Sequence, residues 1–165
     1  MKVATVYTLY GRRAGAEMFF ERTLETALRL YPEVSWTVFC NREAEAVLRT
    51  LCPQAELIPV GMLENQLSKA LWLEFFSRSP VDSLHADVFW SPSGCNYFPG
   101  KWLAPTVTTF LDLGEYRIKG KYDVKRTVYR KRICIPRSVR RSAGFTAISQ
   151  FTADDMGRFL GLQNE

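Results

Sequence analysis

The chain has 165 residues, of which 47% are hydrophobic, and a formal net charge of +5. This length fits one domain and this hydrophobic content can bury a core, so the composition excludes a disordered chain. No stretch approaches the roughly eighteen uninterrupted apolar residues of a membrane span. The apolar run at the N-terminus comes before its basic pair, opposite to the order in a secretory signal. We therefore expect a cytoplasmic protein.

Strands and helices are predicted to alternate along the whole chain. Apolar and β-branched runs predict strands at residues 3–10, 36–40, 56–60, 87–90, 106–111 and 144–148. Apolar residues at spacings of three and four predict helices between them, at residues 16–31, 42–51, 65–77, 122–141 and 150–159. This alternation predicts an α/β layered domain with a mainly parallel sheet.

Three of the predicted helices carry further signals. The helix at 65–77 has four apolar residues on one face, namely Leu67, Ala70, Leu71 and Phe75. Pro136 interrupts the helix at 122–141, because proline lacks an amide donor and clashes with the preceding turn. Ser149 is predicted to cap the last helix and Gly161 to end it.

The four cysteines, Cys40, Cys52, Cys95 and Cys134, are widely scattered and form no C-x-x-C pair. The single histidine, His85, cannot complete a Cys/His zinc set with them. We therefore expect reduced, mostly buried thiols and no bound metal.

The positive charge is concentrated in residues 117–141, which hold one acid and eleven basic side chains. The basic residues are Arg117, Lys119, Lys121, Lys125, Arg126, Arg130, Lys131, Arg132, Arg137, Arg140 and Arg141. This segment carries +10 and the rest of the chain −5. Its candidate partners are an anionic membrane surface, nucleic acid or a phosphorylated ligand, and the alternative is a solvated helix face.

Binding groups of a parallel sheet lie in the loops after its strands, and the first of these loops is GRRAGAE, residues 11–17. It lacks the glycine spacing of dinucleotide-binding and P-loop motifs. Gly15 at a helix start still allows backbone amides to approach an anion closely, with Arg12 and Arg13 adding positive charge. The alternative is a tight turn with solvated arginines.

The loop after the fourth strand lies within WSPSGCNYFPGKW, residues 90–102. Its polar side chains can hydrogen-bond hydroxyls and its aromatic rings offer flat apolar faces, and a sugar ring needs both. These residues are Ser91, Ser93, Asn96, Tyr97, Phe98 and Trp102. The alternative is that Phe98 and Trp102 anchor a long loop to the core.

The loop after the fifth strand is LDLGEYR, in which Asp112 follows an apolar strand directly. Its carboxylate can act as a base or accept a hydrogen bond from a hydroxyl, or it can make an Asx-turn with its own backbone. Ser149 follows the last strand, but no histidine is placed to act as its base, so we expect it to be structural. The residues alone therefore predict a polar and aromatic crevice and no complete catalytic set.

Four segments resemble glycosyltransferase family 4 and related GT-B enzymes. Asp87–Pro92 is similar to the family's D-V-x-H-x-P segment, and Thr109–Leu113 to its T-x-H-D-L segment. Arg141–Thr152 is similar to the R-x-A-x-x-x-x-x-V-S-x-x-T segment, and the AGAE of residues 14–17 to the G-G-x-E that opens the family's first helix. Order and spacing carry the likeness, which is strong from residue 87 onward and weak from 32 to 86.

The resemblance implies a retaining transferase that moves a sugar from a nucleotide-diphosphate sugar to a glycan or lipid-linked acceptor, without metal or other cofactor. Such enzymes pair two Rossmann-like domains, the first holding the acceptor and the second the donor. Residues 1–165 would then be one Rossmann-like N-terminal domain, and the donor-binding domain would lie outside this chain, which alone would be inactive. Polysaccharide biosynthesis is the expected setting.

The resemblance also implies roles for individual residues. Asp112 would be catalytic, Ala14 and Gly15 would lie near the donor phosphates, and the acceptor side would be lined by Asn96, Tyr97, Phe98 and Trp102. The basic helix would contact a membrane's inner face or a lipid phosphate, through Arg126, Arg130, Lys131 and Arg132. Two positions depart from the family, because Trp90 and Leu111 stand where many relatives have histidine.

Two other functions compete with this interpretation. A nucleic-acid-binding domain would use residues 117–141 to follow phosphates and would stack bases on Tyr116, Tyr122 and Tyr129. A non-catalytic sugar-binding or scaffolding domain of the same fold would explain the leucine at position 111.

Overall fold

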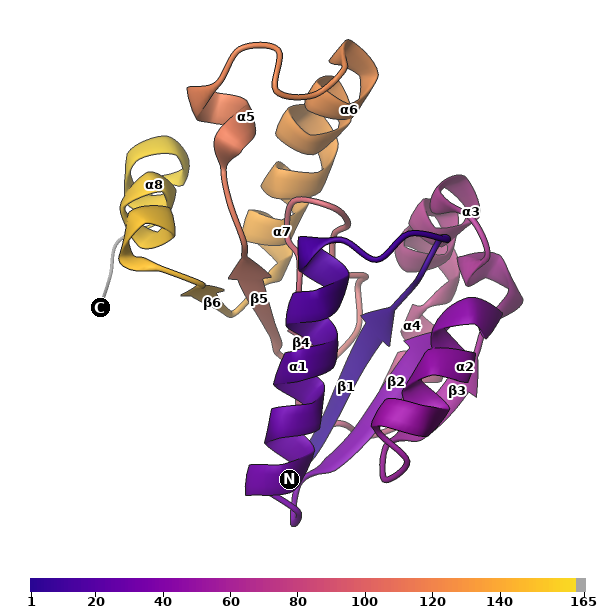
Figure 1. The fold of residues 1–165 in the computed structure, drawn as a ribbon. Helices are drawn as coiled ribbons and strands as arrows, with labels where there is room; N and C mark the ends of the chain where they lie inside the picture. The colour runs from indigo at the N-terminus through magenta and orange to yellow at the C-terminus, as the bar shows by residue number, and fades with distance from the viewer. Residues whose placement is uncertain (163–165) are drawn as a thin grey trace. The chain divides into compact units, whose positions relative to one another are not determined.

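Six strands form a parallel sheet in the order β3-β2-β1-β4-β5-β6 in the computed structural model, which describes residues 1–162 (Figure 1). The strands are β1 (Lys2–Tyr7), β2 (Ser35–Cys40), β3 (Glu56–Pro59), β4 (Val88–Ser91), β5 (Thr106–Phe110) and β6 (Gly144–Ala147). Because the order turns from decreasing to increasing numbers after β1, the topology is that of a Rossmann-like sheet.

Helices lie between consecutive strands, as is common in parallel sheets, except between β4 and β5, which residues 92–105 join without a helix. They are α1 (Gly15–Leu30), α2 (Arg42–Leu51), α3 (Gln66–Leu71), α4 (Arg78–Asp82), α5 (Gly114–Arg117), α6 (Val124–Tyr129), α7 (Ile135–Arg141) and α8 (Gln150–Leu160). Three shorter segments are the 3-10 turn η1 (Gly61–Leu63) and the π-helical segments η2 (Trp72–Phe76) and η3 (Arg130–Cys134). The predicted α/β architecture is confirmed.

The chain divides into two compact units. The first unit comprises residues 1–90 and 100–105, and the second comprises 91–99 and 106–165. The sequence predicts one domain over residues 1–165, and this division into two units does not test that prediction.

In the first unit, alternate residues of β1 pack against α1 and α2. Val3 and Tyr7 point to this side, where Phe20 and Leu24 of α1 and Leu48 of α2 join them in the core. All five side chains are buried, and the period of two along β1 is what a sheet covered on its faces requires. On another side of this unit, Phe39 of β2 contacts Trp72 of η2 with ring centroids 5.4 Å apart.

The second unit has its own core around β5. Phe110, Leu113, Ile135 and Met156 are buried together there. Ser149 caps α8 as predicted, since its hydroxyl oxygen accepts from the Thr152 amide at 3.2 Å. Gly161 ends the helix in the left-handed conformation (φ 69°), which is the predicted stop.

Two helices differ from their predictions, one in which face it buries and the other in how it accommodates a proline. The apolar face of helix 65–77 points to solvent: Leu67, Leu71 and Phe75 are exposed, whereas Lys69 and Trp72 are buried. Helix 122–141 is not broken at Pro136: its backbone stays helical from Val124 to Arg141 and widens into the π-helical η3 just before the proline. A widened turn is a known way to accommodate the hydrogen bond that proline cannot donate.

The cysteines behave as predicted, because all four are free and buried. Burial raises the pKa of the Cys40 thiol to about 12 and that of Cys52 to about 11. No helix within residues 1–162 is long and apolar enough to cross a bilayer. No group of three or more potential metal ligands occurs among the same residues.

Candidate functional site

The topology of the sheet makes the loops at the carboxyl ends of its strands the expected place for a binding site. In a sheet of this order, strand β1 pairs with β2 on one side and β4 on the other, so the order reverses between β1 and β4. Open parallel sheets bind ligands outside the carboxyl ends of strands near such a point. The predicted site residues fall in several places. Those in the second unit are Asn96, Tyr97, Phe98 and Asp112 in two strand-end loops and the four basic residues on α6 and η3, and those in the first unit are Ala14, Gly15 and Trp102.

In the first unit, the loop after β1 is tied down by internal hydrogen bonds. The Tyr7 hydroxyl donates to Glu21 at 2.6 Å, and Arg13 forms an ion pair with the same carboxylate at 3.4 Å. Burial and the neighbouring Glu21 carboxylate raise the pKa of Tyr7, so the phenol stays protonated. Asn41 accepts from the Leu9 amide at 3.1 Å and donates to the Leu9 carbonyl at 2.7 Å. These contacts fix the loop.

Gly15 lies at the exposed start of α1, as predicted. A Cβ placed there would meet no atom within 4 Å, so the space beside this residue is open. The Ala14 amide already donates to Glu17 at 3.1 Å, which places a carboxylate in the first turn of the helix. The start of α1 therefore offers room for a ligand, but one of its amides is engaged by the protein. The role of Ala14 and Gly15 near a donor phosphate stays a prediction.

Two aromatic residues of WSPSGCNYFPGKW belong to the core of the first unit. Trp90 is buried against Phe20, with ring centroids 5.4 Å apart. Trp102 packs on Phe89 with centroids 4.0 Å apart and is half-buried. The indole at position 90, where many family members have histidine, is thus a packing residue.

Asp112 follows β5 directly in the second unit, and its side chain is 48% exposed. Its Oδ1 atom accepts from the Gly114 amide at 2.9 Å, which is the Asx-turn that the sequence allowed. The same oxygen accepts from Lys121 Nζ at 3.3 Å and lies 3.7 Å from Arg130 Nη2. Within residues 1–162, no hydrogen bond or ion pair engages Oδ2. The carboxylate is therefore held by one oxygen and open at the other.

The charge state of Asp112 follows from these contacts. Burial raises the pKa of its carboxyl, but the Gly114 amide, Lys121 and Arg130 together outweigh burial and leave the pKa below its ordinary value. The group is ionised at neutral pH and is a weak base. This geometry suits accepting a hydrogen bond from a hydroxyl better than removing its proton.

Arg130 joins the two strand-end loops of the second unit. Its Nε donates to Glu115 at 3.2 Å and its Nη1 donates to Asn96 at 3.1 Å, while Nη2 lies 3.1 Å from the second Glu115 oxygen. Arg130 and Glu115 are both buried, with side chains 5% and 0% exposed. Asn96 in turn donates to Ser93 at 2.9 Å. The guanidinium thus fixes Asn96 and Asp112 relative to each other.

Tyr97 and Phe98 are buried, with 8% and 3% of their surfaces exposed. The guanidinium groups of Arg137 and Arg141 lie 5.0 and 5.3 Å from the centre of the Phe98 ring. For Phe98 the geometry is that of a loop anchor, the alternative that the sequence left open. Its role and that of Tyr97 in contacting an acceptor stay predictions, although little of either residue is exposed.

Gly94 makes the turn after β4 pack directly on β5. A Cβ at this position would lie 2.5 Å from Thr108 Cγ2 and 3.0 Å from Phe110 Cε1. Both neighbours are buried and belong to the same unit. Ser138 of α7 holds the turn from the other side, since its hydroxyl donates to the Gly94 carbonyl at 2.9 Å. The backbone that carries Asn96 is therefore fixed closely against β5.

The four basic residues predicted to contact a membrane or phosphate differ in their exposure to solvent. Arg126 and Arg132 are exposed, and Lys131 is half-buried with its ammonium 4.4 Å above the Tyr116 ring. Arg130 lies inside the second unit, so its guanidinium does not belong to an exposed basic face. The reason is the buried Glu115 carboxylate, which holds it there by the contacts already described.

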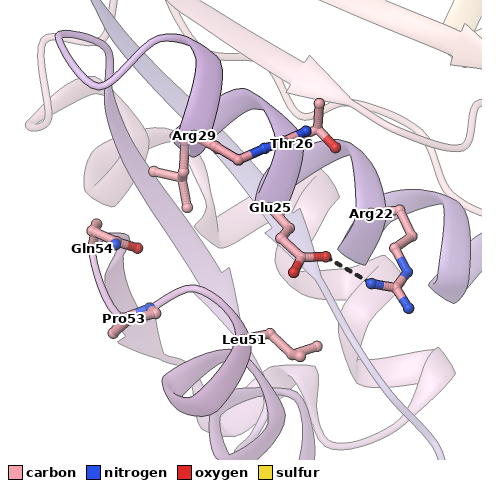
Figure 2. Close-up of a pocket in the computed structure, with 8 residues that line it drawn as sticks. Arg22, Glu25, Thr26, Arg29, Leu51, Pro53 and Gln54 are labelled. Carbon is pink, nitrogen blue, oxygen red and sulfur yellow. Dashed lines mark hydrogen bonds and ion pairs between the residues drawn. The ribbon is translucent and has the colours of Figure 1, made fainter.

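The first unit has a pocket of about 560 Å³ between α1 and the turn that follows α2 (Figure 2). Its lining includes the exposed ion pair Arg22–Glu25 on α1 and Pro53 and Gln54 in the turn. None of the predicted site residues lines it. It lies along the carboxyl-terminal half of α1, away from Gly15, which starts that helix.

Two residues that complete the Asp112 site, Glu115 and Lys121, were not predicted. Lys121 could have been found from its position. It lies nine residues after Asp112, in a segment whose many basic residues have only one acid to pair with. Glu115 had a weaker signal, namely a single carboxylate in the first turn of a helix after a parallel strand. Its burial depends on Arg130, which lies fifteen residues away.

Fold and site together define an α/β protein of Rossmann-like topology with an ionised carboxylate at the carboxyl end of β5. No family model, curated protein or solved structure matches this chain significantly. Its function is therefore argued from its own residues.

Proposed function

We propose that this chain is the acceptor-binding domain of a retaining GT-B glycosyltransferase, which transfers a sugar from a nucleotide-diphosphate sugar to a glycan or lipid-linked acceptor. The observation that carries the proposal is the state of Asp112: an ionised carboxylate after β5, anchored through Oδ1 and open at Oδ2. An open carboxylate oxygen at this edge of the sheet can accept a hydrogen bond from a sugar hydroxyl.

The surrounding groups support a polyhydroxylated ligand. Lys121 and Arg130 keep Asp112 charged, and Arg130 holds the half-buried Asn96 amide in a fixed position. Preorganised polar groups lose little freedom when they bind hydroxyls, and this rigidity favours a binding site over a solvated turn. Donor recognition would require a second domain outside these residues, and Gly15 leaves room for a phosphate to approach.

Binding of a glycan by this chain tests the acceptor role. In an NMR titration, short glycans should shift the amides of Asn96 and Gly114, which contact Arg130 and Asp112, while nucleotide sugars should have little effect. Asp112→Asn keeps the size of the side chain but removes the charge, and it should weaken glycan binding about ten-fold. Asp154→Asn is the matched control, because Asp154 is an exposed acid of the same unit. Equal affinity in both variants would refute the role of Asp112.

The catalytic part of the proposal needs the donor domain. In the enzyme that contains both domains, Asp112→Ala should abolish transfer while the circular dichroism spectrum stays unchanged. Normal transfer by this variant would remove Asp112 from the active site.

A non-catalytic sugar-binding domain is the second candidate, and the residues at positions 90 and 111 favour it. Trp90 is a core residue, and Leu111 has no polar side chain to offer a reacting sugar. This candidate predicts glycan binding without turnover in any longer form of the protein. Transfer in the two-domain enzyme would therefore exclude it.

Nucleic-acid binding has little support from the geometry of the tyrosines. Tyr116 stacks on Phe159 at 5.3 Å between centroids, and the Tyr122 ring lies 4.4 Å from Arg126 and 4.7 Å from Arg130. Rings that already pack against neighbours offer less surface to bases.

A further inference from the structure

Helix α6 carries an apolar pair on its outer surface. Val124 and Val128 are 78% and 51% exposed, and they lie one turn apart on the same side of the helix. None of the residues of α6 is buried. Ile118, in the turn that ends α5, is also 57% exposed. Exposed β-branched residues on a short helix are not explained by the core of the second unit.

Exposed cations without internal partners occur on this helix and in the segments next to it in sequence. Lys119, Lys125 and Arg132 are exposed and make no ion pair or side-chain hydrogen bond among residues 1–162. The one acid of residues 117–141 is Asp123, and its carboxylate caps α6 by accepting from the Arg126 amide at 2.9 Å. The surface therefore combines uncompensated positive charge with apolar side chains.

We infer that this α6 face, formed by Val124, Lys125 and Val128 with Arg132 of the following η3, docks on an anionic lipid bilayer. The headgroups of such a bilayer attract the cations, and the acyl boundary accepts the apolar side chains. A nucleic acid would use the cations but would leave the valines in water. Figure 1 shows the loop after α5 and α6 extending past the carboxyl end of β5 within the second unit. The end of the second unit that carries Asp112 would therefore face the bilayer.

The inference does not depend on sugar transfer and can be tested with this chain alone. Co-sedimentation should show binding to vesicles with 30% phosphatidylserine, weak binding to pure phosphatidylcholine, and loss of binding at high salt, since screening weakens surface attraction. Lys125→Glu with Arg132→Glu should lower the partition coefficient at least about 25-fold, because each cation near such a surface contributes about five-fold. Val124→Ser with Val128→Ser keeps the charge and should lower it at least about five-fold.

Matched controls separate this face from general effects. Arg42→Glu with Arg140→Glu changes the net charge equally, at two exposed arginines outside the α6 face, and should reduce binding much less. Leu67→Ser with Leu71→Ser removes exposed apolar residues of the first unit and should have no effect. Circular dichroism checks that each variant stays folded.

Three outcomes would overturn the inference. Equal losses in the two charge variants would mean that only the overall charge matters. Undiminished binding by the Val124 and Val128 double variant would mean that no apolar contact forms. Tighter binding of single-stranded RNA than of anionic vesicles at the same salt, with the same charge variant abolishing it, would assign the face to nucleic acid. Failure of glycan binding would contradict the proposed function but leave this result standing.

Discussion

The loop after β1 in the first unit and the loop after β5 in the second place polar groups at the same edge of a parallel sheet but treat them differently. Beside the first loop, Oε1 of Glu21 in α1 contacts Tyr7 and Arg13, and Asn41 binds both backbone groups of Leu9. In the second, Asp112 is bound through one oxygen only. Each carboxylate is contacted through one oxygen, and the two differ in exposure. Glu21 is buried, whereas the Asp112 side chain is 48% exposed and can meet a ligand.

This difference separates a polar group that maintains the fold from one that can bind. Both loops read alike in the sequence, as polar and glycine-containing turns after apolar strands. What distinguishes them is the exposure of the carboxylate. Arg13 contacts a buried carboxylate, whereas Lys121 and Arg130 hold a carboxylate at the surface in its charged form.

The largest effect is expected from Arg130→Met. This change leaves Glu115 buried without its partner, and an uncompensated buried charge costs about 3–5 kcal/mol of unfolding free energy. Urea denaturation measures the loss. The double variant Arg130→Met with Glu115→Leu should recover most of it, since it removes both charges. A loss below about 1 kcal/mol for the single variant would show that this pair does not hold the second unit together.

A smaller effect is expected from Tyr7→Phe in the first unit. The Glu21 carboxylate loses one hydrogen bond but keeps Arg13, so the expected loss is about 1 kcal/mol. Tyr31→Phe is the control, because Tyr31 is exposed and should not change the denaturation midpoint. If Tyr7→Phe costs as much as Arg130→Met, the two units do not differ in the way described.

The dependence of stability on pH should report Asp112. Its pKa is lowered in the folded protein, so its contribution is present above the ordinary value of 3.8 and is lost as the pH falls through the folded value. The unfolding free energy of the wild type should therefore exceed that of Asp112→Asn more at pH 7 than at pH 3. A difference independent of pH would mean that the charge of Asp112 is not stabilised in the fold.

The smallest effect is expected from Gly15→Ala, within about 0.5 kcal/mol of the wild type, because no atom lies near the new methyl group. Gly11→Ala should cost about 1 kcal/mol, since Gly11 has a φ of 75° in the left-handed region. Thermal unfolding compares the two variants. A large loss from Gly15→Ala would show that this glycine is needed by the fold itself, not by a ligand.

Most strands and helices could be predicted because their signals are local. Periodicity and capping residues placed β2, α2 and α8 within one residue of their observed bounds. The outward face of helix 65–77 could not be predicted, because the helix is apolar on several sides. Lys69 is buried through contact with Thr8, 61 residues away, and no local signal shows this.

The candidate site was predictable in its position but not in its electrostatics. The rule for parallel sheets placed Asp112 at a strand end, and the Asx-turn was one of its two predicted states. The burial of Arg130 could not be seen in a run of eleven basic residues, because each of them is equally eligible by charge. Only the partner Glu115 distinguishes it.

The close contact of Gly94 with β5 has a consequence for the history of this protein. Any side chain at that position would push into Thr108 and Phe110, which are fully buried and cannot move aside cheaply. Selection on packing therefore acts on Gly94 independently of selection on any reaction. A homologue that has exchanged its Asp112 for another residue should still keep this glycine with a small residue at 108 and an aromatic at 110. A search anchored on these three positions could then recognise diverged members of the lineage whose chemistry has changed.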